Sequence, residues 1–124
     1  MTGALRALLA FAVLAWANGC VTAPPSRYAW GSYEELIYVA AAKPGTLPPE
    51  AQVEQMQKDR ETARGANQKL PPGWHAQLSY LYYQIGRADL AREELLAEKS
   101  EFPESTVLVD RLLGNLGTPA VKSE

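Results

Sequence analysis

The segment from Pro72 to Pro103 constrains the fold most, because it predicts two helices joined by one tight turn. The first predicted helix, 74–85, carries one apolar stripe with helical spacing: Trp74, Leu78, Leu81, Tyr82 and Ile85. Gly86 follows and is expected to end this helix. The second predicted helix, 88–102, carries a matching stripe made of Ala91, Leu95 and Phe102, and Glu98 interrupts it. Two such helices cannot bury their stripes alone, so the rest of the chain must supply neighbouring helices.

Seven residues of this segment fall at defining positions of a repeat of about 34 residues when Pro72 is its first: Leu78, Ser79, Tyr82, Gly86, Ala91, Leu95 and Pro103. The pattern resembles the tetratricopeptide repeat, in which helix pairs stack into an array that binds partner proteins. Two positions depart from it, since His75 occupies the usual tryptophan position and Glu98 replaces a small residue. The alternative is a generic antiparallel helix pair, in which small residues let two helices approach closely.

The N-terminus predicts a signal peptide over residues 1–19. Arg6 is the only charged residue before an apolar run at 7–17, ALLAFAVLAWA. This run is too short for a membrane-spanning helix, which needs about 20 residues.

Cys20 is the only cysteine of the chain and directly follows Gly19 at the end of this signal. The arrangement resembles the lipobox of bacterial lipoproteins, which implies cleavage before Cys20 and acylation of its sulfur and its new amino group. Three acyl chains would give stable anchoring. By the same resemblance, Val21 in place of an aspartate implies the outer membrane. An ordinary secretory signal with a chance cysteine is the alternative.

Residues 20–27 then form the acylated cysteine and a proline-containing linker, which would place the domain roughly 20 Å from the lipid. The next segment, YAWGSYEELIY at 28–38, predicts the start of a helix. Ser32 and Glu35 match a capping box, in which each side chain bonds a free backbone amide of the first turn. One face of this helix is expected to be apolar: Tyr33, Leu36, Ile37, Ala40 and Ala41.

The same segment resembles the W-G-x-Y-E-x-x-L/I-Y signature of a family of short uncharacterised bacterial lipoproteins. The matching residues are Trp30, Gly31, Tyr33, Glu34, Ile37 and Tyr38. Members are similar in length to this chain and are often found near genes for lipoproteins that resemble the curli secretion channel. The resemblance implies an envelope complex of that kind as a partner.

Two further helices complete the prediction. A polar helix over 46–66 should pack through a narrow stripe of Val53, Met56 and Ala63, with its charge-rich run QKDRETAR exposed to solvent. A capping helix after Pro103 should pack through Val109, Leu112, Leu113 and Leu116. The predicted fold is therefore all-α, with antiparallel, tetratricopeptide-like helical hairpins and about five helices in a domain spanning 28–117. Residues 118–124 are expected to form a disordered tail.

The sequence offers few groups for catalysis. His75 is the only histidine, no spacing typical of metal ligands surrounds it, and we expect it to cap or flank its helix. The pairs Glu34–Glu35 and Glu93–Glu94 are expected on solvated surface, because neighbours on a helix point about 100° apart. We therefore expect no enzyme, cofactor or metal, and the net charge of −2 gives no support for a nucleic-acid partner.

The tetratricopeptide-like register instead indicates recognition of a protein or peptide. It places Ala76, Tyr80, Tyr83 and Gln84 on the concave face of the first helix, and Tyr38 joins them from the preceding helix pair. Tyrosines suit such a surface because each offers a large apolar ring and a hydroxyl group. Packing of the same tyrosines against adjacent helices is the alternative.

Two functions follow from these patterns. The first is an outer-membrane lipoprotein on the periplasmic face that acts as a non-catalytic interaction or assembly module. The second is a regulatory lipoprotein that activates a cell-wall (peptidoglycan) enzyme. The short linker disfavours the second function, since contact with an inner-membrane enzyme needs a long reach.

Overall fold

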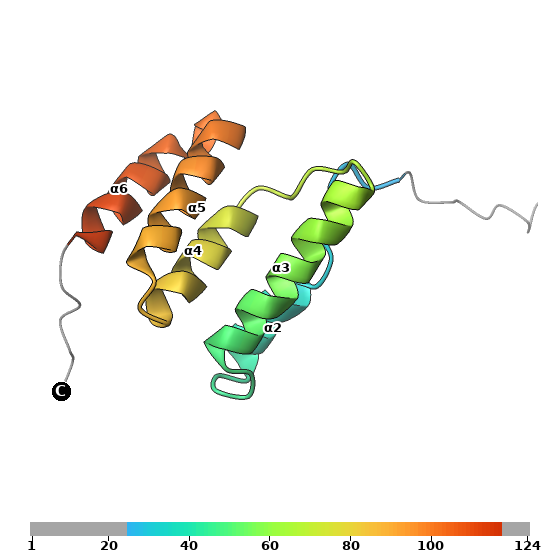
Figure 1. The fold of residues 1–124 in the computed structure, drawn as a ribbon, viewed down its shortest axis with the longest axis horizontal. Helices are drawn as coiled ribbons and strands as arrows, with labels where there is room; N and C mark the ends of the chain where they lie inside the picture. Colours follow the sequence, from blue (N-terminus) through green and yellow to red (C-terminus); the bar gives the residue numbers. More distant parts are fainter. Residues whose placement is uncertain (1–24, 118–124) are drawn as a thin grey trace, which may run out of the picture.

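The computed structural model describes residues 25–117, and within this range it contains five α-helices and one short 3-10 helix (Figure 1). The elements are α2 (Tyr33–Ala42), α3 (Pro49–Gly65), α4 (Trp74–Gln84), α5 (Ala88–Glu101), η2 (Pro103–Ser105) and α6 (Thr106–Leu116). The prediction of an all-α domain with about five helices is confirmed. The predicted signal peptide, Cys20 and the predicted tail at 118–124 lie outside the described residues. None of the described helices is long and apolar enough to cross a membrane.

The helices α4 and α5 form an antiparallel pair at the centre of the domain (Figure 1). Gly86 ends α4 as predicted, because it adopts the left-handed conformation (φ 78°) that glycine tolerates best. The amides of Gly86 and Arg87 donate to the carbonyls of Tyr83 and Tyr82, which satisfies the last carbonyls of the helix in a Schellman motif. This turn directs α5 back along α4.

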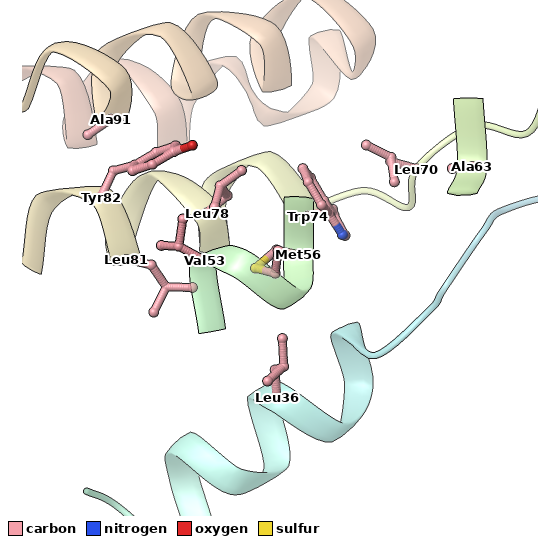
Figure 2. Close-up of a cluster of buried hydrophobic side chains, with 10 residues drawn as sticks. All are labelled: Leu36, Val53, Met56, Ala63, Leu70, Trp74, Leu78, Leu81, Tyr82 and Ala91. Atoms are coloured by element: carbon pink, nitrogen blue, oxygen red, sulfur yellow. The ribbon is translucent and has the colours of Figure 1, made fainter. Parts of the chain in front are cut away.

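The neighbouring helices pack on the two sides of this pair. Helix α6 packs against α5 and α3 packs against α4, while α2 lies beyond α3 at the far end of the domain (Figures 1 and 2). Of the predicted capping residues on α6, Val109 is fully buried and Leu112, Leu113 and Leu116 are half-buried. Both sides of the central pair are therefore covered, as its two apolar stripes required.

The main core lies where α3 and α4 face each other (Figure 2). Trp74, Leu78 and Met56 have no exposed surface at all. Leu70 joins the core from the loop before α4, and the predicted stripes of α2, α3, α4 and α5 supply the other members: Leu36, Val53, Ala63, Leu81, Tyr82 and Ala91. Complete burial of a large apolar side chain stabilises the fold by about 1.5–3 kcal/mol. These contacts confirm the stripe predicted for α4, with Ile85 half-buried at its end.

The segment before α2 is attached to the rest of the domain at two points. Tyr28 forms an isolated parallel bridge with Lys69, and the Ala29 amide donates to the Lys69 carbonyl at 2.8 Å. The Tyr28 ring also meets the Phe102 ring edge-on, with 6.3 Å between their centroids. The start of the domain is thereby fixed against the loop before α4 and the end of α5.

The predicted capping box at the start of α2 is wrong. The Ser32 hydroxyl donates to the Asp59 carboxylate on α3 at 2.5 Å, and the Ser32 amide donates to the same oxygen at 2.8 Å. Asp59 thus accepts the Ser32 amide in place of Glu35, and this carboxylate from α3 joins the two helices. The position of Asp59 also corrects the expectation that the whole QKDRETAR run would face solvent.

The apolar face predicted for α2 is also wrong in extent. Leu36 is the only buried residue of this helix, and Tyr33 is half-buried, whereas Ile37, Ala40 and Ala41 are exposed. The reason is that α2 meets the domain along one narrow line, through Leu36 (Figure 2).

Gly31 provides a test of how α2 is held. It adopts a positive φ of 50°, and a Cβ atom there would lie 2.6 Å from Cγ of Asp59. Gly45 also has a positive φ, of 82°, but a Cβ atom there would meet nothing within 4 Å. We expect Gly45→Ala to cost roughly 1–2 kcal/mol of unfolding free energy from backbone strain alone. Gly31→Ala should cost about 1–2 kcal/mol more, because Asp59 must move away from Ser32.

Urea-induced unfolding of both variants, followed by circular dichroism, measures this difference. Equal losses of stability for the two substitutions would contradict the role given to the contact between Asp59 and Ser32.

Candidate functional site

An apolar groove lies between α4 and α6. It has a volume of about 210 Å³ and is lined by Ala76, Ser79, Tyr80, Tyr83, Leu95, Leu112, Asn115 and Leu116. The four residues from α4 follow one another at helical spacing and form a face of their own beside the core stripe. Leu95 is almost completely buried, whereas Tyr80 is 55% exposed. We call this surface the α4–α6 groove.

The structure brings together three of the four residues predicted to bind a partner. Tyr80 and Tyr83 line the α4–α6 groove. Gln84 donates from Nε2 to the Tyr80 hydroxyl at 2.9 Å, so it orients that ring from the next turn of the helix. Tyr38 is 62% exposed on α2 and does not line the groove. The prediction of one continuous surface that includes Tyr38 is therefore wrong for this groove.

Tyr83 lies where it could bind a partner and also packs against adjacent helices, the two alternatives that the sequence left open. It lines the α4–α6 groove and, half-buried, also packs against the main core cluster. The ring of Tyr80 is the more accessible of the two. Tyr80 is therefore the better probe of anything that enters the groove.

Sequence reasoning missed the second wall of the groove. Leu112, Asn115 and Leu116 supply it from α6, which had been predicted only as a capping helix. The spacing of the two leucines, four residues apart, was a usable signal, because it places both on one helical face. Helix α6 covers the central pair with only part of its apolar face. The rest of that face, including Leu112 and Leu116, lies beside α4 and lines the groove.

A buried polar cluster lies on the other side of α4, formed by Arg60, His75 and Glu94. The imidazole Nδ1 of His75 lies 2.7 Å from Oε2 of Glu94, and the Arg60 guanidinium donates to the other carboxylate oxygen, Oε1. The guanidinium also lies over the Trp74 ring, 5.0 Å from its centroid. We call these three residues the Glu94 cluster.

The Glu94 cluster corrects two predictions. His75 neither caps nor flanks its helix but is buried, with 6% of its surface exposed, and Glu94 is 8% exposed where solvated surface had been expected. Glu93 is exposed, in agreement with the prediction for that residue. The carboxylate of Glu94 can be buried because Arg60 and His75 satisfy both of its oxygens.

Glu98, the polar interruption of the α5 stripe, has a structural role of its own. It is 2% exposed, and its Oε1 accepts a hydrogen bond from the Gly73 amide at 2.7 Å. Gly73 is the residue just before α4, so a carboxylate from α5 caps the positive end of that helix. Burial, followed by the nearby charge of Glu98, raises the pKa of Tyr33 above its ordinary value.

The Glu94 cluster borders an open hollow of about 1040 Å³ between α3, the loop before α4, and α5. The Nε2 atom of His75 points towards Glu101, at 3.5 Å from its carboxylate, but this nitrogen is itself buried. His75 is among the residues that line the hollow, and its Nδ1 contact with Glu94 joins α4 to α5. Among residues 25–117 no group of three or more His, Cys, Asp or Glu residues could hold a metal ion.

The fold and the groove define a small all-helical protein with an apolar groove on one side of a central helix pair. A family model described as "Domain of unknown function (DUF4810)" matches residues 27–112, and the chain belongs to this family. The matched range includes the Glu94 cluster and most of the α4–α6 groove. No curated protein and no solved structure matches the chain.

The Glu94 cluster makes the stability of the domain depend on pH. Burial of the Glu94 carboxylate raises its pKa, but the hydrogen bonds and charges of His75 and Arg60 together lower it further, below the ordinary value of 4.5. Because the pKa is lowered in the folded state, the cluster stabilises the fold above about pH 4.5, and this contribution is lost as the pH falls through the folded pKa.

We expect Glu94→Gln to lower the unfolding free energy by about 1.5–3 kcal/mol at pH 7, the usual cost of losing hydrogen bonds to a charged group. As the pH falls below about 4.5, the unfolding free energy of the variant should also decrease less than that of wild type. Glu93→Gln, at the exposed neighbouring position, is the matched control and should stay within about 0.5 kcal/mol of wild type. Urea unfolding over a series of pH values measures both. If the two variants behave alike, the carboxylate of Glu94 does not hold the helices together.

Proposed function

We propose that this protein is a non-catalytic interaction module, anchored to the bacterial outer membrane through acylated Cys20 and facing the periplasm. In this proposal the α4–α6 groove binds an apolar segment of a partner protein in the cell envelope. The observation that carries the proposal is the groove itself, an apolar surface on a folded helix pair with an exposed tyrosine at its edge.

The size of the groove favours a protein segment over a small ligand. Pockets for small molecules usually have volumes of about 300–1,000 Å³, and the α4–α6 groove has about 210 Å³. A volume of this size accepts one or two apolar side chains of a partner segment. Tyr80 adds a large ring with a hydroxyl held by Gln84, which is the kind of residue that dominates binding energy at protein interfaces.

Two further features support the proposal. The antiparallel pair of α4 and α5, with Gly86 at the turn, fits the tetratricopeptide-like register, in which the first helix of a pair contributes the binding face. The resemblance to a lipobox at Cys20 supports a lipid anchor, and the exposed residues 25–27 fit a short linker between the anchor and the domain. A short linker favours a partner at the same membrane, such as an envelope complex similar to the curli secretion channel.

Photocrosslinking in intact cells tests the groove. A photoreactive phenylalanine analogue in place of Tyr80 should capture a protein from the outer membrane or periplasm, identified by mass spectrometry. Tyr38 is the matched site, because it is an exposed tyrosine outside the groove, at 62% exposure against 55% for Tyr80. The same probe at Tyr38 should not capture that protein. Capture of a peptidoglycan synthase at Tyr80 would replace the assembly role with the regulatory role.

A loss-of-function variant complements the crosslink. Tyr80→Ala should reduce recovery of the captured partner by roughly tenfold or more, the effect of losing a residue that contributes about 1.4 kcal/mol or more to binding. Tyr38→Ala should leave recovery unchanged. If the probe at Tyr80 captures no more than one at Lys58, on the exposed side of α3, the groove does not bind a partner.

The anchor has a separate test. Wild type should incorporate labelled palmitate and fractionate with the outer membrane, whereas Cys20→Ser should lose the label, because Cys20 is the only cysteine. Absence of label from wild type would rule out the lipoprotein assignment without affecting the groove.

A further inference from the structure

We propose that an exposed apolar face of α2 lies on the surface of the membrane to which Cys20 is anchored. The face consists of Trp30, Ile37, Tyr38 and Ala41, and we call it the α2 face. This inference rests on the lipid anchor proposed above and adds the orientation of the domain on its membrane.

The four residues of the α2 face form one continuous patch. Ala41 lies one turn after both Ile37 and Tyr38, at i+4 and i+3, so it joins these two side chains on the helix surface, and Glu34 lies one turn before both. The Trp30 ring stacks on the Tyr33 ring, with 6.2 Å between centroids, and Tyr33 lies one helical turn before Ile37. The indole of Trp30 therefore extends the patch beyond the N-terminal end of the helix.

The α2 face is exposed although most of its side-chain surface is apolar. Trp30, Ile37 and Tyr38 are 37%, 40% and 62% exposed. Leu36 points from α2 towards Val53 and Met56 (Figure 2), so α2 uses a different side to join the domain. A contiguous exposed apolar patch usually marks a contact with another molecule or with lipid.

The position of the patch in the chain favours lipid as its occupant. Trp30 lies ten residues after Cys20, and a fully extended chain spans at most about 3.6 Å per residue, so its backbone stays within about 36 Å of the anchor. Trp and Tyr are the residues that concentrate at membrane surfaces, because the ring is apolar and its polar group can reach water. Among the exposed aromatic side chains of the described residues, Trp30 and Tyr38 therefore have the shortest tether to the anchor.

The arrangement of the helices agrees with this orientation. Helix α2 lies at one end of the domain, and α6, with the α4–α6 groove, lies at the other end, beyond the central pair (Figure 1). Contact of the α2 face with lipid would leave the groove open to the periplasm. A partner could then bind without competing with the membrane.

The charges beside the α2 face predict how it would bind. Glu34 and Glu35 lie in the first turn of α2, and Lys43 directly follows the helix. No cluster of basic residues accompanies the patch in this segment, so attraction to anionic lipid headgroups contributes little. Burial of apolar surface must therefore supply the binding energy, and contact with uncharged vesicles should be insensitive to salt. Anionic lipid should weaken the contact, because Glu34 lies one turn from Ile37 and Tyr38.

Tethered vesicles test the proposal. The chain beginning at Cys20 keeps every described residue, and its single cysteine can be coupled to a maleimide lipid in phosphatidylcholine vesicles. Lipids with brominated acyl chains quench tryptophans that touch the membrane. Trp30 should lose fluorescence in brominated vesicles, whereas Trp74, which has no exposed surface, should not. Trp30→Phe should remove the quenched part of the signal and leave the rest unquenched.

Matched variants distinguish membrane contact through the α2 face from non-specific contact between the domain and the vesicle. Ile37→Glu combined with Tyr38→Glu should abolish the quenching of Trp30, because both substitutions place charge in the patch. Val107→Glu combined with Leu108→Glu, at an exposed apolar pair on α6 outside the groove, should leave the quenching unchanged. Added salt should also leave it unchanged. Circular dichroism of each tethered variant verifies that it is folded.

Folded, tethered wild type whose Trp30 is not quenched would overturn the proposal. Capture of a specific protein in cells by a photoreactive residue at Tyr38 would also overturn it, because the patch would then be a protein interface. The coupling in vesicles is chemical, so the quenching result does not depend on whether Cys20 is acylated in cells or whether the groove binds a partner.

Discussion

One carboxylate joins the three central helices of this domain. Glu94 belongs to α5, and its two oxygens are bound by Arg60 of α3 and His75 of α4. Because the carboxylate is buried, losing either donor would leave one of its oxygens without a hydrogen bond, which costs more than a lost surface contact. Apolar contacts between α3 and α4 favour a small set of crossing angles. The directional bonds to Glu94, together with the Arg60 guanidinium over the Trp74 ring, restrict the orientation of the three helices further.

Local patterns predicted the helices well. The stripe of α4 and the glycine that ends it depend on residues within a few positions of each other, so helical periodicity was enough to place both. The polar partners were missed because they are distant in the chain. Glu94 and Arg60 are 34 residues apart, and Ser32 and Asp59 are 27 apart. A capping-box pattern at Ser32 considers only hydrogen bonds within the first turn of one helix. It cannot reveal that a carboxylate from another helix accepts the Ser32 amide and hydroxyl.

The candidate groove was predicted in part, for a similar reason. Tyr80, Tyr83 and Gln84 share one face of a single helix, so their proximity follows from spacing. Tyr38 was joined to them through an assumed stacking of two helix pairs, which the spacing within one helix cannot establish. The α6 wall depends on how that helix crosses α5, and the order of leucines in the sequence does not encode a crossing angle.

The attachment of the segment before α2 determines how the domain would bear mechanical load. A pull on the N-terminus reaches Tyr28 and Ala29 before it reaches any helix. At that point the force divides between the hydrogen bond to Lys69 and the ring contact with Phe102, which lead to the loop before α4 and to the end of α5. Tension along the chain therefore passes directly into the central helix pair, and α2, the most weakly packed helix, is shielded from being peeled away first.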